Sequence, residues 1–269
     1  MNNKKKFNQI CKDIKSIKIQ GAENIAKKAF YAYKLVPGKA SATKLVSLRS
    51  TEPMLQNILK IADKISYQEL LDKLNNNQQT INEKVCSLIK NNSVVYTHCH
   101  SSSVIKALIY SKKKGKRFVV YNTETRPLFQ GRKTAKELAR AGIKVTMFVD
   151  SAAKIALTKS QDKEEKTRSV DIIFFGADAI TKKGVVNKVG SGMFAEIAKS
   201  NKIPVYIVSD SLKFSNKVKM EQRNPSEVWK TKSKIKIVDP AFELIERQNI
   251  TGIVSELGVL SYNDFLKRN

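Results

Sequence analysis

Short apolar runs that alternate with helical segments are the feature that most constrains the fold of this chain. From residue 93 onward, five runs rich in Val, Ile, Phe and Tyr occupy residues 94–96, 118–121, 145–149, 170–175 and 205–208, and two less regular runs occupy 235–238 and 253–254. Segments of helical composition lie between the first five, at residues 104–114, 133–141, 152–157 and 193–200. The alternation predicts a parallel sheet with helices on both faces, and the almost wholly apolar runs predict strands buried on both sides.

The first 92 residues carry a different pattern, in which apolar residues recur at spacings of three and four. The pattern begins at Ile10, Ile14 and Ile17 and returns at residues 55–65 and 70–90. Such spacing predicts helices, with loops where proline interrupts it at residues 37–38 and 52–53. We therefore expect an α/β chain: a small N-terminal helical domain, residues 1–92, followed by a doubly wound, Rossmann-like parallel-sheet domain, residues 93–269.

The composition bears on partners and location. Of 269 residues, 50 are Lys or Arg and 24 are Asp or Glu, which gives a net charge of +26, while a hydrophobic share of 41% suffices for a packed core. Because 41 of the basic residues are Lys and only 9 are Arg, nucleic acid is not the expected partner; a positive surface still concentrates anions of any kind. No apolar run approaches the ~18 residues that span a bilayer, and no apolar signal core follows the basic N-terminus, so we expect a soluble cytoplasmic protein without a membrane partner.

Polar and reactive side chains follow the predicted strands directly. They occupy residues 97–101, 122–127, 150–151, 176–179 and 209–213. In open α/β sheets, ligands bind beyond the carboxyl ends of the strands. We therefore expect these strand ends to converge on one crevice that holds a ligand.

Cys99 is the candidate nucleophile or base of that crevice. The three cysteines, at positions 11, 86 and 99, are odd in number and scattered, which favours reduced thiols over a disulfide framework. Cys99 precedes Ser101, Ser102 and Ser103 at the start of a predicted helix, where free N–H groups stabilise a thiolate and, with the serine hydroxyls, suit a phosphate. A lone cysteine also commonly serves as a small buried apolar residue.

The two histidines of the chain, His98 and His100, flank Cys99. Alternation along a strand points them away from Cys99, so local packing and hydrogen bonding are expected of them rather than a Cys–His pair. A zinc site would need further ligands that the spacing of the other cysteines does not supply, and we expect no metal. Asp178 follows the run 170–175, where burial of its carboxyl group suits acid–base work, although aspartate also caps helices and turns.

Three cations, Arg126, Lys188 and Lys213, lie near the same strand ends, and residues 187–192 combine two glycines with the start of a helix. Glycine lets a backbone approach an anion closely, but this pattern is not the dinucleotide fingerprint. No P-loop, nucleophile elbow or zincin helix occurs in the sequence. The residues thus favour an α/β enzyme that acts on a small phosphorylated metabolite, with a thiol and a carboxyl group as its proton-transfer groups and no cofactor.

Several motifs in register resemble one known superfamily. It contains the archaeal ribose-1,5-bisphosphate isomerases, the methylthioribose-1-phosphate isomerases and the alpha, beta and delta subunits of translation initiation factor 2B. The matching stretches cover nearly the whole chain from about residue 93: residues 97–101, 123–138, 149–153, 176–180, 184–190, 213–214, 223–225 and 239–242.

The resemblance implies specific roles. In the isomerases the catalytic pair is the Cys of Thr-His-Cys and the Asp of Gly-Ala-Asp, here Cys99 and Asp178, whereas the initiation-factor subunits typically lack that Cys. The chain is most similar to the ribose-1,5-bisphosphate isomerases. The implied substrate-binding residues are Gln20, Gly21, Ala22, Glu23, Ser101, Ser102, Ser103, Arg126, Asn187, Lys188 and Lys213.

The N-terminal half departs from the isomerase pattern. Gln20 and Glu23 stand in a segment that usually reads Arg-Gly-Ala-Gly, residues 42–45 replace a segment that usually carries Arg, and His100 stands where Asn is usual. Loss of a phosphate-binding arginine beside a gained carboxylate would weaken the binding of a bisphosphate. The departures bear on the identity of the substrate rather than on the fold.

The expected function is therefore an aldose–ketose isomerase that converts ribose 1,5-bisphosphate to ribulose 1,5-bisphosphate. The Cys99 thiolate would take the C2 proton, and Asp178 would donate and relay protons among the sugar oxygens. The resemblance also implies a homo-oligomer (dimer or hexamer) and a role in salvage from AMP. The alternatives are an isomerase of another sugar 1-phosphate, such as methylthioribose 1-phosphate, and a non-catalytic regulatory subunit whose partner is translation initiation factor 2.

Overall fold

The first part of the chain is a group of helices, α1 (Asn3–Lys15), α2 (Ala22–Leu35), α3 (Lys39–Ser47), α4 (Pro53–Lys60) and α5 (Tyr67–Leu88). The computed structural model describes residues 2–49, 51–158, 168–220 and 223–269. Local sequence explains where helices begin: Asn2 accepts the N–H of Lys4 at α1, and Ser66 and Glu69 form a reciprocal capping box at α5. The predicted helical character of this part is confirmed.

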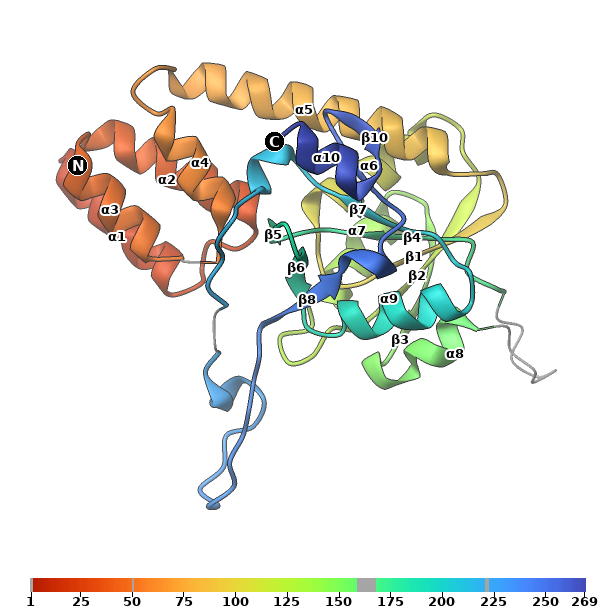
Figure 1. Cartoon of the computed structure of the whole chain (residues 1–269). Helices are drawn as coiled ribbons and strands as arrows, with labels where there is room; N and C mark the ends of the chain where they lie inside the picture. The colour runs from red at the N-terminus through yellow and green to blue at the C-terminus, as the bar shows by residue number, and fades with distance from the viewer. Residues whose placement is uncertain (1, 50, 159–167, 221–222) are drawn as a thin grey trace.

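A seven-stranded sheet forms the centre of the rest of the chain (Figure 1). The strands lie in the order β10-β9-β7-β4-β1-β2-β3, and all neighbours are parallel except β9 and β10. Their bounds are β1 (Ser93–Thr97), β2 (Phe118–Thr123), β3 (Lys144–Phe148), β4 (Ile172–Phe175), β7 (Val205–Val208), β9 (Gly252–Ser255) and β10 (Gly258–Leu260). A second, antiparallel sheet has the order β5-β6-β8, with β5 (Ala179–Ile180), β6 (Gly184–Lys188) and β8 (Phe242–Glu246).

Helices cover both faces of the large sheet. One face is covered by the second half of α5 with α6 (Ser102–Lys113) and α7 (Gln130–Arg140), and the other by α8 (Ala153–Leu157), α9 (Ser191–Ser200) and α10 (Tyr262–Lys267). Strand β1 shows the division, because Val94 and Tyr96 belong to one core and Val95 to the other. The predicted doubly wound α/β fold is confirmed.

Helix α5 connects the two parts of the chain. Its Leu70 and Leu74 pack in the core of the N-terminal helices, whereas Ile81 and Val85 pack against the sheet. Figure 1 shows α5 running from the N-terminal helices across the sheet. The division into domains at residue 92 stays a prediction, since α5 contributes to both cores. No helix in the described ranges combines the length and apolarity that a bilayer span requires.

The predicted strand at residues 235–238 is wrong. These residues lie in an arm, residues 223–240, that projects away from the body of the molecule (Figure 1). Ile235 and Val238 are 55% and 67% exposed. An apolar run becomes a strand only where another strand pairs with it, and within the described residues none pairs here. The sequence pattern does not predict the short strands β5, β6 and β8, because β5 has two residues and the other two mix polar with apolar residues.

We expect the substitution Ile173→Ala, in the centre of β4, to lower the free energy of unfolding by about 2–5 kcal/mol, because this side chain is fully buried between the helical layers. Urea unfolding followed by circular dichroism measures the change. The matched control is Ile155→Ala in α8, whose side chain is 49% exposed, and its effect should stay within about 0.5 kcal/mol. Equal losses in the two variants would contradict the assignment of the core.

Candidate active site

The order of the strands opens a crevice at the carboxyl ends of β1 and β4. The chain moves outward from β1 to β2 and β3 and then returns to the other side of β1 with β4. In open α/β sheets, the ligand-binding crevice lies between the carboxyl ends of two neighbouring strands whose connections run in opposite directions. Cys99 follows β1 and Asp178 follows β4, so the topology brings these two side chains to one place.

A cavity of about 160 Å³ occupies this crevice. The N-terminal end of α2 closes it from the side of the helical part, and α7, β6 and the turn η2 (Ser211–Lys213) also contribute to its lining. It brings together ten of the residues expected at a site from the sequence: Gln20, Gly21, Ala22, Cys99, Ser101, Ser102, Asp178, Asn187, Lys188 and Lys213.

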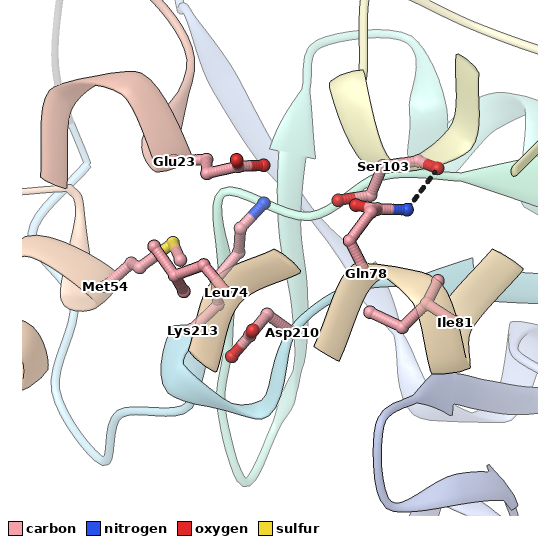
Figure 2. A pocket seen from close by; sticks show the side chains of 8 residues that line it. All are labelled: Glu23, Met54, Leu74, Gln78, Ile81, Ser103, Asp210 and Lys213. Carbon is pink, nitrogen blue, oxygen red and sulfur yellow. Dashed lines mark hydrogen bonds between the residues drawn. The ribbon is translucent and has the colours of Figure 1, made fainter. Parts of the chain in front are cut away.

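Three expected substrate-binding residues lie outside the lining of this cavity. Arg126 is exposed, with its guanidinium group 4.9 Å from the ring centroid of Phe129. Glu23 and Ser103 line a separate cavity of about 10 Å³, which is room for about one water molecule. Figure 2 shows Glu23 and Lys213 pointing toward one another there, so Lys213 lies between the two cavities. The carboxylate of Glu23 pairs with Lys106 of α6 at 3.1 Å and with Lys27, and these cations hold its pKa below the usual value despite burial.

The backbone of Cys99 adopts a left-handed conformation, with φ +63°. Such a conformation costs a residue other than glycine about 1–3 kcal/mol, and it persists only where neighbours impose it. Here the N–H of Cys99 donates to Oγ1 of Thr125 at 3.1 Å, and its carbonyl accepts from the hydroxyl of Thr134 at 2.7 Å. The thiol is therefore presented by a backbone that is fixed from both sides.

Gly176 lets the ends of β1 and β4 approach each other. A Cβ atom at this position would lie 2.5 Å from Oγ of Ser101 and 2.6 Å from its Cβ, which is closer than atoms can pack. Ser101 is the N-cap of α6 and accepts the N–H of Val104. Sterics therefore explain why the first residue of Gly-Ala-Asp is glycine: it allows Ser101 and Asp178 to line the same cavity.

Burial raises the pKa of the Cys99 thiol to about 11, with a further increase from the charges of Asp178 and Asp150. The ammonium group of Lys188 and the backbone N–H of His100 act in the opposite direction, but they do not outweigh the loss of solvation. Cys99 therefore carries its proton at neutral pH in this structure. This differs from the expectation of a thiolate at a helix N-terminus, because desolvation exceeds the effect of the helix.

The two histidines have structural roles, as expected. Nε2 of His98 lies 3.0 Å from the carbonyl of Val189, so it must carry the proton, and Nδ1 accepts from the hydroxyl of Thr123 at 2.6 Å. Burial lowers the pKa of His98 to about 4, which keeps the ring neutral. His100 lies 3.2 Å from Oγ1 of Thr134, and burial lowers its pKa as well.

Two buried lysines, Lys188 and Lys213, line the cavity. The ammonium group of Lys188, at the end of β6, lies 5.2 Å from the ring centroid of Phe242. That of Lys213 donates to the carbonyl of Ala177 at 2.6 Å. Asn187 also lines the cavity, where its amide donates to Oγ of Ser191 at 3.0 Å. Cations held at this depth, beside the N-cap Ser101, form an end of the cavity that suits an anion.

Two arginines that line the cavity are absent from the site predicted from the sequence, although Arg223 belongs to the matching stretch 223–225. Arg49 forms a buried ion pair with Glu52 at 3.2 Å, and Arg223 pairs with Glu227 at 2.9 Å. Residues 42–45 replace a segment that usually carries arginine in the family. Arg49 follows only a few residues downstream, so the sequence did contain an arginine that could take its place. Among the residues that the structure describes, no three His, Cys, Asp or Glu side chains are grouped closely enough to hold a metal ion.

The fold and the site together define a doubly wound α/β protein with a half-buried thiol, a carboxylate and two buried lysines at its topological switch point. Residues 18–262 match the model of the initiation factor 2 subunit family. The chain belongs to this family, as the resemblance of its motifs predicted.

Individual relatives narrow the class further. The chain is 31% identical to ribose 1,5-bisphosphate isomerase of Thermococcus kodakarensis, over 94% of this chain and 90% of that protein. It is 33% identical to 5-deoxyribose 1-phosphate isomerase of Clostridium botulinum, over 68% of this chain and 56% of that protein. Among solved structures, translation initiation factor eIF-2B of Pyrococcus horikoshii OT3 superposes with a TM-score of 0.80 at 25% identity, covering 95% of this chain and 96% of that chain. The similarity to isomerases confirms the prediction of an enzyme, an isomerase of the intramolecular oxidoreductase type.

We expect Gly176→Ala to lower the free energy of unfolding by about 1–3 kcal/mol, because the new methyl group meets Ser101. The double variant Gly176→Ala/Ser101→Gly should recover most of the loss, since glycine serves as an N-cap at a cost of only a few tenths of a kcal/mol. Urea unfolding of the wild type, both single variants and the double variant gives the coupling energy. Additive losses would show that these two residues do not meet.

Proposed function

We propose that the protein is a sugar-phosphate isomerase that converts ribose 1,5-bisphosphate, an aldose phosphate, into the ketose ribulose 1,5-bisphosphate. The observation that carries this proposal is the meeting of Cys99 and Asp178 at one cavity, beside the buried cations Lys188 and Lys213. The relatives named as isomerases of sugar phosphates support it. The cations would bind a phosphate group, and the thiol and the carboxyl group would move protons.

The reaction needs an acid and a base at neighbouring atoms. The phosphate on C1 keeps the sugar as a ring, so the C1–O4 bond breaks as O4 receives a proton, while a base removes the proton on C2. The resulting C1–C2 enol phosphate becomes the ketose when the hydroxyl proton on O2 leaves and C1 receives a proton. Two protons are taken up and two are released, so no oxidant or reductant is required.

Cys99 and Asp178 can supply both groups if one proton is shared between them. At rest the thiol holds it, because burial and the nearby carboxylate raise the pKa of Cys99 to about 11. Transfer of that proton to Asp178 leaves a thiolate to take the C2 proton and a carboxylic acid to protonate O4. Lys188 and the N–H of His100 stabilise the thiolate, since both lower the pKa of the thiol.

Removal of either group should abolish most of the activity. We expect Cys99→Ser and Asp178→Asn each to lower kcat by roughly 10²–10⁴-fold, the usual contribution of a positioned acid or base. A product assay with ribose 1,5-bisphosphate measures this. Cys86→Ser is the matched control, because this half-buried thiol lies on α5 and does not line the cavity, and it should retain wild-type activity. Wild-type activity no higher than that of the two variants would refute the proposal.

A second candidate substrate is a pentose 1-phosphate without a second phosphate group. The charge of Arg49 is balanced by the buried carboxylate of Glu52 at 3.2 Å, and the neutral Gln20 lines the cavity near the start of α2. A cavity whose arginines are paired with carboxylates, Arg49 with Glu52 and Arg223 with Glu227, favours one phosphate over two. The ratio of kcat/KM for ribose 1,5-bisphosphate to that for 5-deoxyribose 1-phosphate distinguishes the candidates. A ratio above about 10 supports the bisphosphate and one below about 0.1 supports the monophosphate. Each factor of ten corresponds to ~1.4 kcal/mol of transition-state stabilisation.

We also propose a homo-oligomer, a dimer or a hexamer, located in the cytoplasm. The edge strand β3 and the arm expose large apolar side chains, including Met147 and Trp229, which a second copy would cover. A regulatory subunit that binds translation initiation factor 2 is the remaining alternative, supported by the likeness to eIF-2B. Retention of Cys99 and Asp178 favours the enzyme, for which a role in salvage from AMP stays a prediction.

A further inference from the structure

The carboxylate of Asp150 holds the loop that follows β2. Asp150 begins the turn η1 (Asp150–Ala152), directly after the edge strand β3. Its Oδ1 accepts the N–H of Thr125 at 2.9 Å, and its Oδ2 accepts the N–H of Arg126 at 2.7 Å. Both carboxylate oxygens are therefore committed to two successive peptide groups of one neighbouring loop.

Thr125 has a backbone conformation that needs such support. Its φ is +63°, in the left-handed region, where a β-branched residue is a rare outlier. Its side chain is fully buried, so solvent does not hydrate its groups. The two charge-assisted hydrogen bonds that Asp150 accepts stabilise this left-handed conformation at position 125, where the loop has no glycine to adopt it.

The buried hydroxyl of Thr125 in turn fixes Cys99. Oγ1 of Thr125 accepts the N–H of Cys99 at 3.1 Å, and φ of Cys99 is +63° as well. Thr134, also buried, donates to the carbonyl of Cys99 at 2.7 Å. Two left-handed residues on neighbouring loops are thus linked by hydrogen bonds, and the link ends at a carboxylate outside the lining of the cavity.

We propose that Asp150 is a positioning residue for the proton-transfer thiol, which it holds in place through the backbone of Thr125. This inference rests on the proposed function of Cys99. It goes further by assigning a role to a carboxylate that does not line the cavity. The role is to keep Thr125 in its left-handed conformation, so that its hydroxyl fixes the peptide group of Cys99 in the cavity that Asp178 also lines.

The pH dependence of Cys99 alkylation distinguishes a carboxylate that only stabilises the loop from one that acts on Cys99. The charged and titratable groups around the thiol are Lys188 from β6, Asp178 after β4, Asp150 from η1, and His98 and His100 of its own segment. Asp150 raises the pKa of Cys99 through its charge, so neutralising it lowers that pKa. The alkylation of Cys99 reports this change without any substrate.

The test compares Asp150→Asn with Asp171→Asn in the full-length protein. Asp171 is the matched control, because its carboxylate accepts the N–H of Val94 at 2.7 Å beside the amino end of β4. Asp150→Asn should lower kcat about 10-fold or more with KM changed less than about 2-fold, while Asp171→Asn changes neither. The rate of reaction of Cys99 with iodoacetamide, followed by mass spectrometry of its peptide, should rise at a lower pH in Asp150→Asn than in the wild type.

The hydroxyl of Thr125 gives an independent check. Thr125→Val should reproduce the loss of kcat, and Thr125→Ser, which keeps the hydroxyl, should restore at least about a third of the wild-type value. The proposal is overturned if Asp150→Asn lowers thermal stability without moving the alkylation profile, or if it behaves like Asp171→Asn. Should the wild type isomerise no sugar phosphate, the proposed function fails, and the alkylation profiles still decide whether Asp150 acts on Cys99.

Discussion

The parallel pairing of β1 with β4 is the constraint on which the site depends. The chain leaves the two strands toward opposite edges of the sheet, so their carboxyl ends are joined to no common helix and a crevice remains between them. Gly176 lets the backbone after β4 approach Ser101 after β1, and the crevice is therefore narrow. The end of β1 carries Cys99 and the end of β4 carries Asp178, and both residues line the cavity.

Burial at this crevice has opposite effects on binding and on reactivity. Removal of water would strengthen the electrostatic attraction of Lys188 and Lys213 for the phosphate of the proposed substrate, because both lysines are buried. The same desolvation raises the pKa of Cys99 to about 11 and keeps the thiol protonated. Under the proposed function, one proton shared between Cys99 and Asp178 would provide an acid and a base with no change in net charge.

Sequence patterns predicted the fold because it depends on local periodicity. The rule that ligands bind beyond parallel strands predicted that Cys99 and Asp178 meet at one crevice, and both line one cavity. Local sequence patterns do not predict how segments pack against one another. The ion pair of Arg49 with Glu52 depends on how the helical part packs, and the exposed Ile235 looks like a strand residue until its lack of a pairing partner in the described chain is seen.

The proposed function depends on transfer of the C2 proton of a bound sugar phosphate by Cys99 and Asp178. The most direct test follows deuterium from substrate labelled at C2, by proton NMR of the product, in the wild type, Cys99→Ser and Asp178→Asn. Proton transfer through a solvent-exchangeable thiol predicts that the wild type releases deuterium to water, and that both variants release it and form product roughly 10²–10⁴-fold more slowly. Product that keeps all of its deuterium, or Cys99→Ser that works at the wild-type rate, would contradict the account.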